Sequence, residues 1–212
     1  MKHLREFRVN KYSQNGEDGV IQEILKRLDL NGPGTFCEFG AWDGKHFSNT
    51  YLLLETLGWR GVYIEGDFEK YQDLLKLQSE YEDKLICINK FVNHQGDDTL
   101  DKILESTHLE KDFDLLSIDI DSFDYQVWDS LKNYSPKIVV IEVNSGAGSE
   151  KKQIHTLDQD GNVIEQGSSY ASTLELGTKK GYTCIYHYGN MIFLRSDLFN
   201  NEKFEHGAFE WN

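Results

Sequence analysis

The sequence predicts an α/β fold, a doubly wound and mostly parallel seven-stranded sheet that ends in an antiparallel hairpin. Short apolar runs alternate with helical patterns along most of the chain, which is typical of parallel βαβ units. Two of these runs carry a carboxylate at their far end, as expected for a sheet buried on both faces. Near the carboxyl end, two further runs flank Gly189-Asn190, which is a hairpin signal. A chain of 212 residues with 39% hydrophobic content suits a single domain over residues 1–212.

Composition excludes several classes of function. The net charge of −14 argues against a nucleic-acid partner, because such binding depends on clustered Lys and Arg. No apolar run reaches the ~18 residues of a membrane-spanning helix, so we expect no membrane partner. Cys37, Cys87 and Cys184 each fall in an expected strand, which predicts buried free thiols. Their odd number, without an apolar leader, indicates a cytoplasmic protein, and the oligomeric state stays open.

The first 30 residues predict a helical lead-in. Ser13–Asp18 is polar, and apolar residues then mark one helix face. Asn15 with Asp18 three residues later resembles a capping box. Asn31-Gly32-Pro33-Gly34 is the strongest break in the chain and precedes the first core strand.

Residues 35–67 organise the rest of the prediction. Their elements are a strand at 35–39, a turn with Gly40 and Gly44, a helix at 50–57 after a Ser48-Asn49 cap, and a strand at 61–64 that ends at Glu65. In such a sheet, ligands bind outside the carboxyl ends of the strands, where Glu65 could accept ribose hydroxyls. The turn holds the carboxylates Glu38 and Asp43 and lacks the third glycine of G-x-G-x-x-G. Acidic groups oppose a pyrophosphate and suit the cationic S-adenosylmethionine (SAM), so we prefer SAM to NAD.

The remaining elements follow in order. We expect helices at 68–81, 99–107, 125–131 and 172–180, and strands at 85–89, 114–120, 137–144, 183–188 and 191–194. Residues 145–169 have little periodicity, and a long loop beside a site is usually functional. We interpret this loop as an acceptor lid with a small hairpin around Gly161; the alternative is a flexible insertion without a role.

The E-x-G-x-x-x-G turn with Glu65 resembles class I SAM-dependent methyltransferases. The wider pattern is similar to FkbM-like methyltransferases in Ser13–Asp18, Ser117–Asp121 and Asn190–Arg195, and it covers roughly residues 12–198. This resemblance implies a Rossmann-like fold and methyl transfer to an oxygen of a sugar or sugar-derived metabolite, in polysaccharide or secondary-metabolite modification. Asp121-Ser122 stands where the family usually carries Glu-Gly, and this departure concerns the acceptor.

Nine residues are candidates for binding SAM. The resemblance places Gln14 and Glu17 beside the cofactor, although both also suit a plain helix start. Asn93 follows the third strand, near the expected adenine, where a simple loop role is the alternative. The full set is Gln14, Glu17, Glu38, Gly40, Asp43, Gly44, Glu65, Asn93 and Asp119.

The acceptor side is expected at the ends of two strands. Asp119, Asp121, Glu142 and Asn144 share one edge of the sheet, and their oxygens suit a divalent cation such as Mg²⁺. The arrangement resembles the metal site of catechol-type O-methyltransferases; a cofactor cap and a helix start are the alternatives. His155, in the lid, is the candidate base, with Asp121 and Glu142 as further catalytic candidates.

Two other functions remain in view. One is an NAD-linked Rossmann oxidoreductase, which needs a turn suited to phosphate. The other is a catalytically inactive cofactor-binding subunit, which would bind SAM tightly without consuming it.

Overall fold

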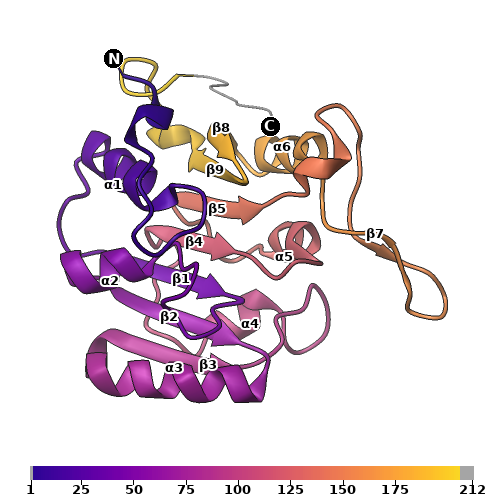
Figure 1. Ribbon diagram of the computed structural model, residues 1–212, viewed down its shortest axis with the longest axis horizontal. Coiled ribbons are helices and arrows are strands. Elements are labelled where there is room, and N and C mark those ends of the chain that lie inside the picture. The colour runs from indigo at the N-terminus through magenta and orange to yellow at the C-terminus, as the bar shows by residue number, and fades with distance from the viewer. Residues whose placement is uncertain (1, 206–212) are drawn as a thin grey trace.

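The computed structural model describes residues 2–205 and contains the predicted seven-stranded sheet (Figure 1). The strand order is β3-β2-β1-β4-β5-β9-β8, in which β1 to β5 are parallel and β9 is antiparallel to both neighbours. The strands are β1 Thr35–Phe39, β2 Arg60–Glu65, β3 Leu85–Asn89, β4 Leu115–Ile118, β5 Ile138–Glu142, β8 Tyr182–Tyr188 and β9 Asn190–Arg195. The helices are α1 Glu17–Arg27, α2 Tyr51–Leu57, α3 Phe68–Tyr81, α4 Leu100–Leu104, α5 Asp124–Ser130 and α6 Tyr170–Lys179.

Helices cover both faces of the sheet, with α1, α2 and α3 on one face and α4, α5 and α6 on the other (Figure 1). Side chains of each strand alternate between the two faces. Phe36 and Tyr63 pack in the core under α1 to α3, whereas Cys37 and Val62 pack in the core under α4 to α6. The sheet is therefore buried on both sides, and only its strand ends are free to form a site.

The late hairpin is inserted beside β5. The chain runs along the sheet edge as β8, turns at Gly189, and returns as β9 between β8 and β5. The register pairs Glu142, the last residue of β5, with Asn190, the first residue of β9. This turn therefore meets the carboxyl end of the parallel sheet.

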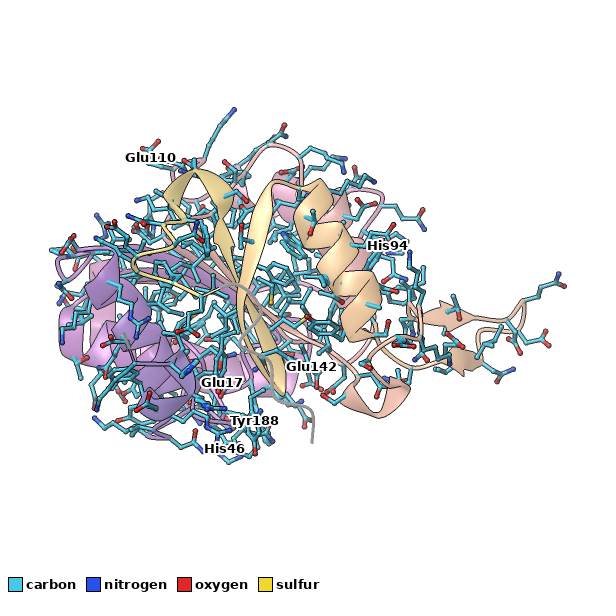
Figure 2. The ribbon with its side chains drawn as sticks, turned by 90° about the horizontal axis from the view of Figure 1, so that it is seen from above. Glu17, His46, His94, Glu110, Glu142 and Tyr188 are labelled. Atoms are coloured by element: carbon cyan, nitrogen blue, oxygen red, sulfur yellow. The ribbon has the colours of Figure 1, made fainter. Side chains whose placement is uncertain are left out.

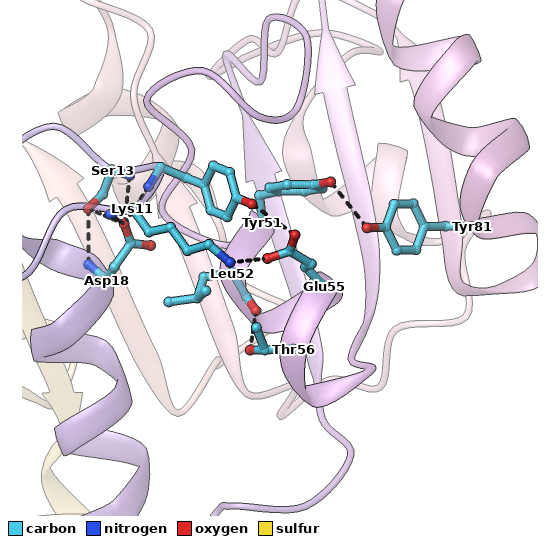
Figure 3. A network of polar contacts seen from close by, with 9 residues as sticks. Lys11, Ser13, Asp18, Tyr51, Leu52, Glu55, Thr56 and Tyr81 are labelled. Carbon is cyan, nitrogen blue, oxygen red and sulfur yellow. Dashed lines mark hydrogen bonds and ion pairs between the residues drawn. The ribbon is translucent and has the colours of Figure 1, made fainter.

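The start of α1 corrects one prediction, because Asn15 and Asp18 do not form a capping box. Gly16 is the N-cap residue, with a left-handed φ of 98°, and the Asp18 N–H in the first turn donates to Ser13 Oγ at 3.0 Å. Asp18 is buried, and its Oδ2 accepts hydrogen bonds from the backbone N–H groups of Lys11, Tyr12 and Ser13, each at 2.8 Å. Figure 3 shows this carboxylate among its donors. The carboxylate thus orders the preceding loop instead of the helix end.

The expected hairpin around Gly161 is present. Strands β6, Thr156–Leu157, and β7, Val163–Glu165, pair antiparallel, and Gly161 has a φ of 84° in the turn. The pair projects away from the sheet (Figure 1). Val163 and Ile164 are 52% and 65% exposed, so this hairpin adds little to the core.

The three cysteines are free and buried, as predicted. Among residues 2–205, none of the helices has both the length and the apolar character needed to cross a membrane.

Candidate active site

Two pockets open at the carboxyl edge of the sheet and share Asp119 and Asp121, which follow β4. The β2 pocket, about 440 Å³, is lined by the end of β2 and by residues that follow β1, β2, β3 and β4; among its lining residues are Gly40 and Glu65. The β5 pocket, about 390 Å³, is lined by residues from the α1 approach, the end of β5, the 145–169 loop and the β8–β9 turn. A ligand could therefore occupy both pockets at once, with its reacting group beside the shared carboxylates.

Gly40 forms part of the floor of the β2 pocket. Its φ is +73°, and a Cβ there would lie 1.8 Å from the carbonyl oxygen of Asp119. Only glycine allows this close approach of two backbones. Gly44 differs, because a Cβ would meet Leu77 of α3 at 2.6 Å, and the residue lies outside the lining of both pockets. Its contacts are with the core.

Glu65 is fixed at the end of β2. Its Oε2 accepts from the Trp42 N–H and its Oε1 from the Asp67 N–H, both at 2.8 Å. Each carboxylate oxygen has a second lone pair, so Glu65 keeps the capacity to accept two ligand hydroxyls. The position matches the one predicted for ribose recognition.

Glu38 and Asp43, the two carboxylates of the turn after β1, stabilise the conformation of that turn. Glu38 is buried, and its oxygens accept from Ser48 Oγ at 2.7 Å, Thr50 Oγ1 at 2.5 Å and the Asn49 N–H at 3.0 Å. Burial raises the pKa of Glu38 in spite of these bonds. Asp43 Oδ1 accepts from the N–H groups of the two residues that follow Gly44, at 2.9 and 2.7 Å. Neither carboxylate lines the β2 pocket or the β5 pocket, so both act on a ligand there through the backbone that they hold.

An acidic cluster lies where the pockets meet. One oxygen each of Asp119, Asp121 and Glu142 lie within 4.8 Å of one another. Burial, together with the negative charges of Glu142 and Asp124, raises the pKa of Asp119 to about 8. Burial and the charges of Asp121 and Asp124 raise the pKa of Glu142 to about 7. The cluster therefore favours a cation or a shared proton.

The loop below the cluster is held by Asp124, whose oxygens accept from the Ile120 and Ser122 N–H groups at 2.8 and 2.9 Å. Asp121 within this loop has a left-handed φ of 57°. Residues other than glycine adopt such a φ at a cost in free energy, which is smaller for Asp than for most, and such positions are common at functional sites.

The predicted amide residues divide between the pockets. Gln14 and Asn144 line the β5 pocket, and Asn93 lines the β2 pocket. Asn144 is already engaged at both ends, since Oδ1 accepts from the Gly146 N–H at 3.0 Å and Nδ2 donates to the Gln166 carbonyl at 2.9 Å. A metal would have to use the second lone pair of its oxygen.

His155 lies apart from the cluster, contrary to its predicted role. It is 4% exposed and lines neither pocket. Its Nδ1 accepts from the Gly167 N–H at 3.2 Å, and its ring packs edge-on against Phe123. Burial lowers its pKa. The geometry thus gives His155 a packing role between the 145–169 loop and Phe123, and it argues against its action as the base.

Sequence reasoning missed Asn190, which lines the β5 pocket opposite Glu142. Glu17, a predicted cofactor residue, is buried outside the pockets and accepts from Asn190 Nδ2 at 2.9 Å. Figure 2 labels Glu17, the first residue of α1, and Glu142, the last residue of β5. The available signal was the hairpin turn itself, because β9 returning against β5 places the first residue of β9 at the end of β5.

No family model and no curated protein match the chain, but solved structures do. The N-terminal domain of EvdMO1 with SAH bound has a TM-score of 0.51 at 10% identity, over 86% of this chain and 82% of that one. The CurJ carbon methyltransferase has a TM-score of 0.53 at 11% identity, over 87% and 56%. Monomeric WbdD has a TM-score of 0.51 at 16% identity, over 88% and 43%, so the chain spans about half the length of these last two. These likenesses show that the chain has the Rossmann-like methyltransferase fold.

Proposed function

We propose that the protein is a SAM-dependent methyltransferase that methylates an oxygen of a small acceptor, a sugar or sugar-derived metabolite. The observation that carries the proposal is the pair of pockets joined at Asp119 and Asp121, one with a fixed carboxylate for a ribose and the other strongly polar. The fold agrees, because two solved structures of the same fold are those of a carbon methyltransferase and of a domain with SAH bound.

The residues of the β2 pocket suit the cofactor. Glu65 would accept the ribose hydroxyls, and the exposed Asn93 side chain would meet the adenine. Asp119 lies where the two pockets meet, so it would face the positively charged end of SAM. When bound, SAM supplies an electrophilic methyl group on a sulfonium. The absence of a third glycine and the acidic turn suit this cofactor better than a pyrophosphate.

The β5 pocket suits an acceptor with hydroxyl groups. Its polar lining comes from carboxylates and amides, and the resemblance to FkbM-like methyltransferases supplies the suggestion of a sugar. Without a cation in the cluster, Glu142, with a pKa raised to about 7, would take the proton of the reacting hydroxyl as its oxygen attacks. The pocket contributes most by orienting the acceptor oxygen, since methyl transfer is an in-line displacement.

We include a divalent cation such as Mg²⁺ in the proposal as an aid to this step. Asp119, Asp121 and Glu142 supply hard oxygen ligands, which fit such an ion. The ion would hold the acceptor and lower the pKa of its hydroxyl. Chelation is then expected to reduce turnover, and full activity in excess EDTA would remove the metal from the proposal.

One observation favours an NAD-linked oxidoreductase instead. Lys70 and Lys90 line the β2 pocket and could meet phosphate groups. Lys90 is, however, paired with Asp98, and Lys70 lies over the Trp42 ring. SAM therefore remains the better supported cofactor.

A thermal-shift titration with SAM, S-adenosylhomocysteine and NAD, each with and without Mg²⁺, tests the proposal. A ligand at a hundredfold excess over Kd stabilises the folded state by about 2.7 kcal/mol. We expect a higher melting temperature with the two adenosyl compounds only. Stabilisation by NAD, or by none of the three, would overturn the assignment. Tight SAM binding without methyl transfer to any acceptor would instead indicate an inactive partner subunit.

A further inference from the structure

A buried hydrogen bond joins the first residue of α1 to the first residue of β9. Glu17 has no exposed surface, and its Oε1 accepts from Asn190 Nδ2 at 2.9 Å. Its Oε2 accepts from the Asn15 N–H at 2.7 Å. Both oxygens of Glu17 act as acceptors, so the Asn190 amide is held with its NH₂ group toward Glu17.

The carbonyl oxygen of Asn190 is then the group left to face the β5 pocket. Asn190 is 6% exposed and lines this pocket. Within residues 2–205, no protein group donates to Asn190 Oδ1. The atom is also not among the fully buried side-chain oxygens and nitrogens, so it keeps surface open to the pocket and can accept a hydrogen bond from a ligand or water there. The register pairs Asn190 with Glu142, which belongs to the acidic cluster.

The wall around Asn190 offers acceptors and negative charge. Asp119, Asp121 and Glu142 contribute carboxylates, and no Lys or Arg is among the residues that line the pocket. Donors are present as well: the Gln166 amide is bonded to the Asp121 carbonyl, whereas the side chains of Gln14, Asn15 and Ser145 could donate to a ligand. When no cation neutralises the cluster, a phosphate or carboxylate on the ligand would meet like charge here, whereas a hydroxyl or an ammonium group would find acceptors.

We propose that Asn190 determines acceptor specificity and that Glu17 is its positioning residue. Glu17 turns the amide so that Oδ1 faces the β5 pocket, where it selects an acceptor group that donates a hydrogen bond and carries no negative charge. This inference rests on the proposed function and adds the class of acceptor to it. Glu17 thus affects which acceptor binds through the orientation of Asn190, without contacting the acceptor itself.

The central variant is Glu17→Gln. A glutamine amide can donate to Asn190 Oδ1, so the Asn190 amide is free to turn over and present its NH₂ group to the pocket. Glu23→Gln is the matched control, because Glu23 lies on the same helix and is paired with Arg27, outside both pocket linings. Asn190→Ser removes the amide itself and serves if Glu17→Gln does not fold.

The probes are glucose, glucosamine and glucose 6-phosphate, which share one ring and differ in charge. Each is titrated by NMR, in the presence of EDTA, into protein saturated with S-adenosylhomocysteine, so that no cation occupies the cluster and no turnover occurs. We expect glucose and glucosamine to shift the side-chain NH₂ signal of Asn190 and to bind Glu17→Gln and Asn190→Ser about threefold to tenfold more weakly, the usual effect of one hydrogen bond. The Glu23→Gln variant is expected to match the wild type, and the affinity for S-adenosylhomocysteine is expected to stay constant throughout.

Three results would overturn the inference: equal binding of glucose 6-phosphate and glucosamine, an Asn190 signal that no probe shifts, or equal loss of sugar and S-adenosylhomocysteine affinity in Glu17→Gln. Failure of the proposed function is distinguishable, because the wild type would then bind no adenosyl compound. The Asn190 signal is in that case followed in the unliganded protein.

Discussion

At the scale of single residues, Gly40 is the position where the site tolerates least change. We expect Gly40→Ala to lower the free energy of unfolding by well over ~1 kcal/mol, because both the positive φ and the contact with the Asp119 carbonyl oppose a Cβ. Loss of SAM binding should accompany it. Denaturant unfolding and calorimetry measure the two effects.

Gly96→Ala is the matched control for this prediction. Gly96 also has a positive φ, of 82°, but a Cβ there would meet nothing within 4 Å. The Gly96→Ala variant therefore measures only the free-energy cost of placing alanine at a positive φ. Similar losses of stability in the two variants would show that the approach of Gly40 to β4 is unimportant.

Glu38 makes a second prediction, for stability. Glu38→Gln replaces one acceptor oxygen with a donor that faces the Asn49 N–H or the hydroxyls of Ser48 and Thr50. Leaving a buried donor unsatisfied costs about 1–3 kcal/mol, which urea unfolding would detect. The exposed Glu69→Gln is expected to change stability by less than ~0.5 kcal/mol. Equal effects of the two substitutions would contradict the role assigned to Glu38.

At the scale of elements, the local sequence pattern was sufficient to predict a helix or a strand where apolar residues recur with the period of that element. The helix at 68–81 and the strand at 85–89 have the predicted bounds. The helix expected from Thr50 begins at Tyr51, because Ser48 Oγ accepts from the N–H groups of Thr50 and Tyr51. That hydroxyl is in turn held by Glu38, thirteen residues before the helix, which no helical pattern encodes.

Part of the site was predictable from the positions of the strands. Strand ends located Glu65, Asp119 and Glu142 correctly at one edge, since parallel strands share their carboxyl ends. The positions of Asn190 and His155 depend instead on contacts between distant segments. Asn190 reaches the pocket because β9 pairs with β5. His155 is buried because its ring packs against Phe123.

The β6–β7 hairpin allows a prediction about a whole element. Replacing residues 157–163 by Gly-Gly should change the free energy of unfolding by less than ~1 kcal/mol, because Leu157 and Val163 are exposed and the closed loop becomes shorter. If the 145–169 loop is an acceptor lid, methyl transfer should fall while SAM affinity is retained. An unchanged rate in a transfer assay would remove the lid function.

At the scale of the whole molecule, the acidic site sets how stability depends on pH. The pKa of Asp119 is raised to about 8 and that of Glu142 to about 7, so the folded state holds these protons more tightly than the unfolded chain does. Stability of the unliganded protein should then fall as pH rises from about 4 to about 8 and level off above that. Melting temperatures across this range measure the slope.

Removing the charges tests the cause. The double variant Asp119→Asn with Glu142→Gln should melt at a higher temperature than wild type at pH 8 and show a flatter slope. Asp160→Asn, at the exposed tip of the hairpin, is the control and should leave the slope unchanged. A slope that persists in the double variant would place its origin elsewhere, for instance at the buried Asp124, whose pKa is also raised.

The insertion of β9 between β5 and β8 has a consequence for the nascent chain. As the ribosome extends the protein, β1 to β5 emerge first, and β5 has no partner on its outer edge until residues 190–195 appear. At ~5–20 residues per second, this edge stays bare for on the order of several seconds. Unpaired strand edges invite aggregation, so chaperones that shield hydrophobic strands would have their target in this interval. The Glu17–Asn190 bond closes only afterwards, so the wall of the β5 pocket is completed last.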